Sequence, residues 1–264
     1  MPLVRNEDFV EFVRDKKVAL VGPAKSIQDI EQGNLIDSYD IVCRVKSFYV
    51  HPEMRKFYGS RVDVLYTDND ETNDVLPGDI IIDDGDKRLI SMSQNSIQLR
   101  EDILKNEVKY VVSTYPKAEW SFSRFINPLA KISQDANVRI LPDEPYMSIR
   151  KETLRPNGGF SAIIDLVSLP LRELYITGID FYRSLYKENY LNSLYSKETI
   201  EDWEKTHDGK TAEGKLDRHN PDLQFKYFKY NIFRKDDRIC VDEKLKEFLS
   251  DKKYESFKES LNQS

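Results

Sequence analysis

The sequence predicts an α/β protein of one domain, in which a mostly parallel, twisted sheet is flanked by helices. Short apolar runs rich in β-branched residues alternate with helical patterns along the chain, which is typical of a parallel sheet buried on both faces. With 264 residues the chain is long enough to bury a sizeable core, and its 15 Tyr and 13 Phe argue against disorder. We therefore expect a single domain over residues 1–264.

The elements follow from the pattern in chain order. Apolar residues within 9–13 share one side of a helix predicted over 7–15, and "KVALV" (17–21) is the first strand. A helical piece is predicted to end near Gly33, before a buried strand over 41–45. Further strands are predicted over 62–67, 79–84, 110–114, 138–141 and 173–179, and further helices over 158–169, 221–234 and 241–261. The polar stretch 183–218 is predicted to be a lid-like loop region, because long loops in compact domains often carry function.

Composition narrows the class of protein. A net charge of −6 does not favour non-specific attraction to nucleic acid or to an anionic membrane, so no nucleic-acid partner is expected. Cys43 and Cys240 lack metal-ligand spacing and predict two buried thiols in a reducing compartment. The N-terminal stretch is charged, and no run approaches the roughly 18 apolar residues of a membrane span. These features predict a cytoplasmic protein without a transmembrane segment, and they leave its oligomeric state open.

The first strand runs into "VGPAKSI", a Gly-Pro turn followed by small, basic and hydroxylic residues. A strand that delivers such a turn into a helix places backbone N–H groups where an anion can bind, and Lys25 and Ser26 are suited to face a phosphate. The turn lacks the GxGxxG dinucleotide pattern, and the chain has no Walker loop. Taken alone, these residues are equally consistent with an anion site and with a simple strand end.

Proton-transfer and metal-binding candidates are few. The three histidines are His51, which is expected in a surface loop, and His207 and His219 in the later polar part of the chain. Two Asp-x-Asp pairs have the spacing with which metal-dependent sugar transferases hold a divalent ion against a diphosphate. These pairs are Asp68/Asp70 and Asp84/Asp86, and chance spacing among 46 acidic residues is the competing explanation.

Three stretches in order carry a family resemblance. The first begins at "VALVGPAKSI" and contains "IDSYDIVCR" and, later, "GSRVDVLYT"; the second is "LRPNGGFSAIIDLVSLPLRELYITGIDFY", and the third is "HNPDLQ". They resemble the long, short and very short motifs of the sialyltransferases of glycosyltransferase family twenty-nine, especially short bacterial and viral-type relatives. The resemblance covers about 120 residues. It implies a single Rossmann-like domain, a sialyltransferase-type GT-A variant.

The resemblance also implies an activity: inverting transfer of sialic acid or a related nonulosonate from a CMP-activated donor to the hydroxyl of a glycan or glycoconjugate, with no metal or other cofactor. His219 would be the general base, and His207 stands where the family often has a histidine that stabilises the leaving phosphate. Nucleotide binding is implied for Gly22, Ala24, Lys25, Ser26, Arg44, Lys46, Asn157, Gly158, Gly159 and Phe160. Lys46 stands where the family usually has an Asn, and Asn157 and Gly158 stand where it usually has hydroxyl residues; these departures bear on the identity of the donor.

A further group of residues follows the strand that is predicted to end near Ile179. Loops at the carboxyl ends of parallel strands build sites in α/β proteins, which makes this group a candidate for substrate binding, with ordinary loop packing as the alternative. It consists of Asp180, Tyr182, Arg183 and Tyr186.

Two other functions stay open on the sequence alone. A metal-dependent nucleotide-diphosphate-sugar transferase would use one of the Asp-x-Asp pairs. A nucleotide-binding module without catalysis would keep the glycine turn and have no working base.

Overall fold

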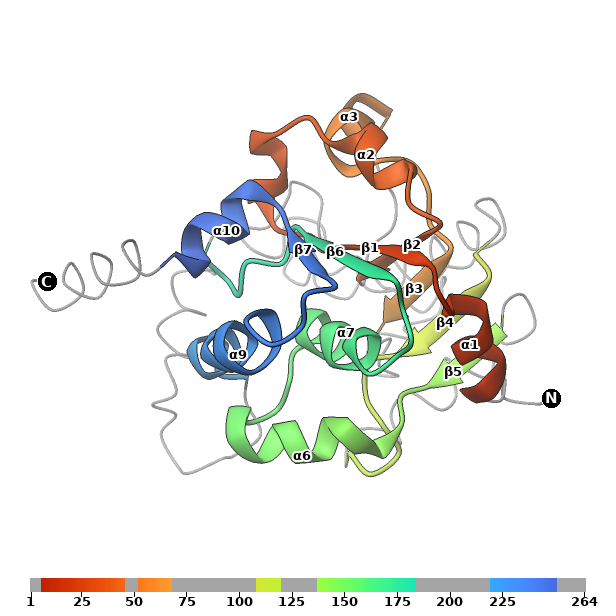
Figure 1. Ribbon diagram of the computed structural model, residues 1–264, viewed down its shortest axis with the longest axis vertical. Coiled ribbons are helices and arrows are strands. Elements are labelled where there is room, and N and C mark those ends of the chain that lie inside the picture. The colour runs from red at the N-terminus through yellow and green to blue at the C-terminus, as the bar shows by residue number, and fades with distance from the viewer. Residues whose placement is uncertain (1–5, 46–51, 68–107, 120–136, 184–218, 251–264) are drawn as a thin grey trace, which may run out of the picture.

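The computed structural model describes residues 6–45, 52–67, 108–119, 137–183 and 219–250. Within them, seven strands form one sheet in the order β5-β4-β3-β2-β1-β6-β7, and every neighbouring pair is parallel (Figure 1). The predicted α/β class, with a parallel sheet flanked by helices, is therefore confirmed.

The strands match the apolar runs closely. They are β1 (Lys17–Val21), β2 (Ile41–Val45), β3 (Val64–Thr67), β4 (Tyr110–Ser113), β5 (Asn137–Ile140), β6 (Glu173–Thr177) and β7 (Ile239–Val241). The first two have the predicted bounds, and the strand predicted over 79–84 lies outside the described residues. β7 has three residues and was not predicted, because so short a run between charged residues gives no period-two signal.

The helices predicted over 7–15, 158–169, 221–234 and 241–261 each have a counterpart among the described helical segments. These segments are α1 (Asn6–Val13), η1 (Lys25–Asp29), α2 (Gly33–Asp37), η2 (Pro52–Met54), α3 (Arg55–Tyr58), α6 (Asp143–Thr153), α7 (Gly158–Val167), α9 (Pro221–Tyr227), η5 (Phe228–Phe233) and α10 (Glu243–Leu249). α6 was not predicted. The helix predicted to end near Gly33 is wrong, because α2 begins there: a Cβ on Gly33 would lie 1.9 Å from the Arg55 carbonyl oxygen, so this glycine permits close packing on α3.

Two apolar layers cover the faces of the sheet. One face packs against α1, α7 and α9, through fully buried side chains such as Phe9, Ile163 and Phe225. The other packs against η1, α2 and α3, through Ile27 and Tyr58. Figure 1 shows α6, α7 and α9 on one side of the strands and α2 and α3 on the other. Burial on both faces explains why the strands read as continuous apolar runs.

A buried ion pair joins the sheet to α7. Arg139 on β5 donates two hydrogen bonds to the Asp165 carboxylate, at 2.6 and 2.8 Å, and both side chains are 1% exposed. The Tyr66 hydroxyl on β3 donates to the same carboxylate at 2.7 Å, and burial raises the pKa of Tyr66 well above its ordinary value. The Arg139 guanidinium also lies 4.4 Å from the centre of the Phe9 ring. Side chains from β3 and β5 thus meet at one carboxylate of α7.

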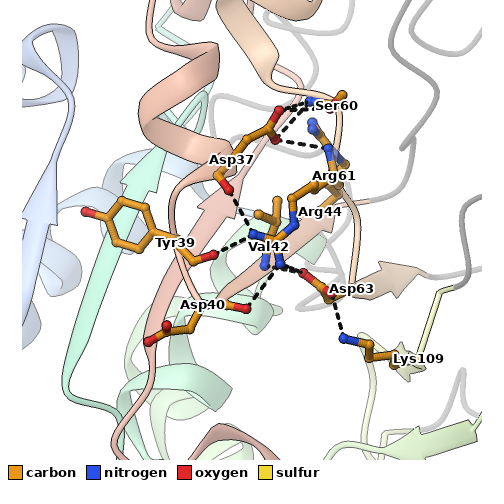
Figure 2. Close-up of polar contacts among 9 residues, drawn as sticks. All are labelled: Asp37, Tyr39, Asp40, Val42, Arg44, Ser60, Arg61, Asp63 and Lys109. Atoms are coloured by element: carbon orange, nitrogen blue, oxygen red, sulfur yellow. Dashed lines mark hydrogen bonds and ion pairs between the residues drawn. The ribbon is translucent and has the colours of Figure 1, made fainter.

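A second polar network ties together the amino ends of β2, β3 and β4 (Figure 2). Arg61 is its centre: its guanidinium donates to the carbonyl oxygens of residues 37, 39 and 40 and to the Asp63 carboxylate at 2.9 Å. The Asp63 carboxylate also accepts from the Val42 amide at 2.9 Å and from Lys109 at 3.1 Å. The Asp37 carboxylate accepts from the amides of residues 60 and 61. The polar residues of "IDSYDIVCR" and "GSRVDVLYT" therefore hold adjacent strands together.

The cysteines differ from expectation in one respect. Cys43 is buried in β2, and burial raises the pKa of its thiol. Cys240, on the short edge strand β7, is exposed, so the prediction of two buried thiols is wrong for this residue. Among the described residues, no helix is both long enough and apolar enough to cross a membrane.

Candidate active site

The sheet has one point where its strand order reverses. The chain adds β2, β3, β4 and β5 on one side of β1 and then returns to place β6 and β7 on the other side. In open parallel sheets, ligands bind beyond the carboxyl ends of the strands at such a point. Here these ends are Val21 of β1 and Thr177 of β6, which pair directly in the sheet.

The turns that follow β1 and β6 lie against each other. The Gly22 amide donates to the Thr177 carbonyl at 2.8 Å, and the Ala24 amide donates to the Gly178 carbonyl at 2.9 Å. A Cβ on Gly22 would lie 2.2 Å from the Gly178 oxygen, so only glycine permits this approach. Gly22 and Ala24 therefore use their amides to join the two turns, and their structural role differs from the phosphate contact that the resemblance implies.

The next residues bring the two predicted groups together. The Ser26 hydroxyl donates to the Asp180 carboxylate at 3.2 Å, and both side chains are buried. Lys25 opens η1 beside them and is partly buried. A residue predicted to bind nucleotide and a residue predicted to bind substrate are therefore in direct contact across the strand-order reversal.

The turn after β6 has an unusual backbone. Gly178, Phe181 and Tyr182 have φ values of 65°, 55° and 63°, in the left-handed region that bulky residues rarely adopt. The Phe181 ring is held in the core against Phe160 and Phe225, with centroids 6.0 and 5.5 Å away. Packing thus fixes a backbone conformation that costs energy locally, and such conformations concentrate at functional sites.

Arg183 closes this turn onto α9. Its guanidinium donates to the Phe181 carbonyl and to the Asp222 carboxylate, both at 3.2 Å, and lies 3.8 Å from the centre of the Phe225 ring. The side chain is 12% exposed. These contacts account for Arg183 as a link between β6 and α9.

The start of α7 faces the same region. The Asn157 side chain caps the helix by accepting from the Phe160 amide at 2.9 Å, and Gly159 lies against Ile179, with its virtual Cβ 3.4 Å from a side-chain carbon. The amides of Gly158 and Gly159 occupy the first two helical positions, which have no intrahelical acceptor, and the helix dipole adds positive potential there. The resemblance implies that Phe160 contacts the nucleotide. In the structure its ring is fully buried in the core, and its amide donates to the Asn157 side chain that caps the helix.

His219 lies between the end of α6 and the start of α9. It forms an isolated antiparallel bridge with Leu154, and its Nδ1 lies 2.8 Å from the Arg155 carbonyl oxygen. A carbonyl oxygen only accepts, so Nδ1 carries the hydrogen and Nε2 of the neutral ring carries the lone pair. Asn220 then caps α9 by accepting from the Leu223 amide at 3.0 Å, which fixes the chain directly after His219. This is the form of histidine that takes a proton at Nε2.

Gln224 is a site residue that the sequence analysis missed. Its side chain is fully buried and bonds both the Arg155 carbonyl, at 2.9 Å, and the Asn157 amide, at 3.4 Å. The sequence offered one sign of its role: Gln224 is a polar residue five positions after His219, within the helix predicted over 221–234. Its partners are main-chain groups, and these leave no trace in the sequence.

Arg44 has structural contacts in place of the nucleotide contact that the resemblance implies. Its side chain is 1% exposed and donates to the carbonyls of Arg61 and Tyr58, each at 2.8 Å. Burial lowers the pKa of this guanidinium to about 10. We assign Arg44 to the fold, where it holds the turn that leads into β3.

Several predicted site residues lie outside the described part of the chain. They are Lys46, Tyr186, His207 and the two pairs Asp68/Asp70 and Asp84/Asp86. In the part that is described, no three His, Cys, Asp or Glu side chains are grouped as metal ligands would be.

The contact between Gly22 and Gly178 gives a prediction. Gly178→Ala is expected to destabilise the protein by roughly 2–4 kcal/mol, because alanine resists the left-handed backbone and its Cβ would lie 2.5 Å from the Gly22 oxygen. Urea unfolding followed by circular dichroism measures the change. Gly159→Ala is the matched control, since its Cβ makes only ordinary contacts of 3.4 to 3.6 Å. Equal stability of the two variants would contradict the conclusion that the contact between Gly22 and Gly178 requires glycine.

Comparison with known proteins yields a likeness of fold. No model of a protein family matches the sequence, and no curated protein matches it. A mammalian sialyltransferase in complex with Gal-beta-1-3GalNAc-ortho-nitrophenol superposes with a TM-score of 0.50 and 10% identity, over 89% of this chain and 71% of that chain. A second structure of a mammalian sialyltransferase gives a TM-score of 0.49 and 13% identity, over 88% and 71%. The chain is therefore similar in fold to a sialyltransferase.

Proposed function

We propose that the protein is an inverting glycosyltransferase that moves sialic acid or a related nonulosonate from a CMP-activated donor to a hydroxyl of a glycan, without a divalent metal. The carrying observation is the bond between His219 Nδ1 and the Arg155 carbonyl, which leaves the lone pair of the neutral ring on Nε2. Gln224 connects this base to the start of a helix suited to bind an anion. Its side chain bonds the Arg155 carbonyl, which also contacts His219, and the amide of Asn157, which caps α7. The similar fold of a mammalian sialyltransferase supports the same class.

The donor subsite is assigned to the start of α7. A phosphate bound there would accept from the amides of Gly158 and Gly159, in the positive field of a ten-residue helix. Lys25 and Ser26 come from η1, which follows β1 at the strand-order reversal. In this arrangement the nucleotide spans the carboxyl ends of β1 and β6, as ligands of such sheets do.

The reaction is a direct displacement. The acceptor hydroxyl oxygen forms a bond to the anomeric carbon while the bond from that carbon to the phosphate oxygen breaks, and CMP leaves with the electron pair. His219 Nε2 takes the hydroxyl proton as the new bond forms. The helix amides stabilise the charge that develops on the departing phosphate. Attack from the face opposite the leaving group inverts the anomeric centre.

The acceptor class is a glycan hydroxyl. The similar mammalian sialyltransferase was crystallised with a galactose-containing disaccharide derivative, Gal-beta-1-3GalNAc-ortho-nitrophenol. We therefore propose a terminal galactoside as the first acceptor to test. Asp180, buried beside Ser26, is the residue we assign to bind a substrate hydroxyl.

Donor identity is tested by ligand-dependent stability. CMP is expected to raise the unfolding midpoint more than CDP, UMP, UDP or GDP, because a ligand that binds only the native state adds about 2.7 kcal/mol when its concentration is 100 times its dissociation constant. Differential scanning fluorimetry with and without EDTA measures this shift. A larger shift with UDP than with CMP would overturn the CMP assignment.

Turnover is tested separately. CMP-sialic acid and a galactoside are expected to give CMP and a sialylated product at the same rate with and without EDTA. Loss of transfer in EDTA would favour the metal-dependent alternative that uses an Asp-x-Asp pair. Binding of CMP without turnover of any nucleotide sugar would favour a nucleotide-binding module.

A further inference from the structure

Gln224 forms a bridge between the two parts of the proposed site. Its fully buried side chain donates from Nε2 to the Arg155 carbonyl at 2.9 Å and accepts at Oε1 from the Asn157 amide at 3.4 Å. A carbonyl oxygen only accepts and a main-chain amide only donates, so these two partners fix the orientation of the Gln224 amide group.

The Arg155 carbonyl is shared by two donors. His219 Nδ1 lies 2.8 Å from the same oxygen that accepts from Gln224, so both lone pairs of this oxygen are directed. The Arg155 guanidinium is in turn placed over the Tyr115 ring, 4.3 Å from its centre. Arg155 is thus held at two places: Gln224 of α9 bonds its carbonyl, and the Tyr115 ring packs against its guanidinium.

The other half of the Gln224 amide reaches the donor side. It holds the amide of Asn157, and the Asn157 side chain caps α7 through the Phe160 amide at 2.9 Å. One side chain therefore connects the carbonyl that orients His219 to the residue that begins the proposed phosphate-binding helix.

We propose that Gln224 is a positioning residue for His219: it holds the Arg155 carbonyl that keeps the imidazole in its Nδ1–H form and fixes the distance of the ring from the start of α7. The catalytic meaning of this assignment rests on the proposed function, whereas the effect on the histidine does not. A neutral amide supplies the donor and the acceptor at once. An ionised glutamate at this position would keep the bond from Asn157 and lose the bond to Arg155, and methionine would lose both.

The first test reads the ring directly. The chain has three histidines, so two-bond ¹H–¹⁵N correlation NMR of the whole protein resolves them, and the signals absent from His219→Gln assign His219. We expect the Nδ1–H tautomer in the wild type and a mixture of both tautomers in Gln224→Glu and Gln224→Met. Asn231→Asp is the matched control, an amide-to-carboxylate change at an exposed position of η5, and is expected to keep the wild-type tautomer.

The second test separates catalysis from donor binding. Both Gln224 variants are expected to lower kcat by about 10- to 100-fold, the size of effect that a displaced catalytic group produces. Gln224→Glu is expected to keep the KM for the donor, because the bond to Asn157 remains. A wild-type tautomer in Gln224→Glu overturns the proposal, and this variant decides the matter if Gln224→Met does not fold. If the wild type transfers no sugar, the proposed function fails, while the NMR result still confirms or overturns the positioning of His219.

Discussion

His219→Ala is expected to lower kcat for sugar transfer by roughly 100- to 10,000-fold, the range that a general base contributes. The physical reason is the loss of Nε2, the atom that carries the lone pair because Nδ1 is bonded to the Arg155 carbonyl at 2.8 Å. Affinity for CMP is expected to change little, since the proposed phosphate donors belong to α7. Release of CMP from CMP-sialic acid in the presence of acceptor measures kcat, and a CMP-dependent shift in unfolding midpoint measures binding.

The control for this experiment is another histidine. His51→Ala removes a side chain that the sequence predicts in a surface loop, and it is expected to keep wild-type kcat. His219→Gln retains a hydrogen-bond donor near the Arg155 carbonyl while removing the base, so it separates local folding from proton transfer. Undiminished transfer by His219→Ala would remove this residue from the mechanism.

Asp165→Ala is expected to cost about 3–5 kcal/mol of unfolding free energy, because it leaves the guanidinium of Arg139 buried without a counter-charge. The two side chains are each 1% exposed and share two short hydrogen bonds. The Tyr66 hydroxyl loses its acceptor as well. Urea unfolding followed by circular dichroism gives the free energy, with the transition midpoint expected well below that of the wild type.

Two comparisons make this prediction specific. Glu11→Ala removes an ion pair with Arg14 that is exposed to solvent, and exposed pairs contribute little, so its unfolding midpoint is expected to match the wild type. The double change Arg139→Met with Asp165→Leu is expected to recover much of the lost stability, since an apolar pair leaves no charge unpaired. Identical midpoints for Asp165→Ala and Glu11→Ala would show that the buried pair has no special role.

The sequence predicted the central strands of the sheet correctly and missed the short edge strand β7. β1 and β2 have their predicted bounds because each is a continuous apolar run between turn-forming or charged residues. The predicted helix end at Gly33 is wrong because a glycine can either end a helix or permit close packing, and here its role is set by the distant Arg55 carbonyl. β7 is too short to give a pattern of its own, and its place is set by pairing with β6.

For the candidate site, the sequence pointed to several side chains that lie close together in the structure, and it gave no sign of the main-chain contacts that join them. Residues of all three quoted stretches meet at one edge of the sheet, as the contacts of Ser26 with Asp180 and of His219 with the segment before α7 demonstrate. The Arg155 carbonyl, which orients His219 and receives Gln224, is present in every residue type and so leaves no signal in a sequence. The glycine turn was ambiguous for the same reason, because its partner is the backbone of Gly178.

The Arg61 network separates the support of the sheet from the proposed site. It fastens the amino ends of β2, β3 and β4, whereas the proposed donor contacts lie at the carboxyl ends of β1 and β6. Substitutions at the proposed donor contacts are therefore expected to leave the Arg61 network in place. The polar residues of "IDSYDIVCR" and "GSRVDVLYT" therefore support the scaffold at the rim of the sheet that lies away from the proposed site.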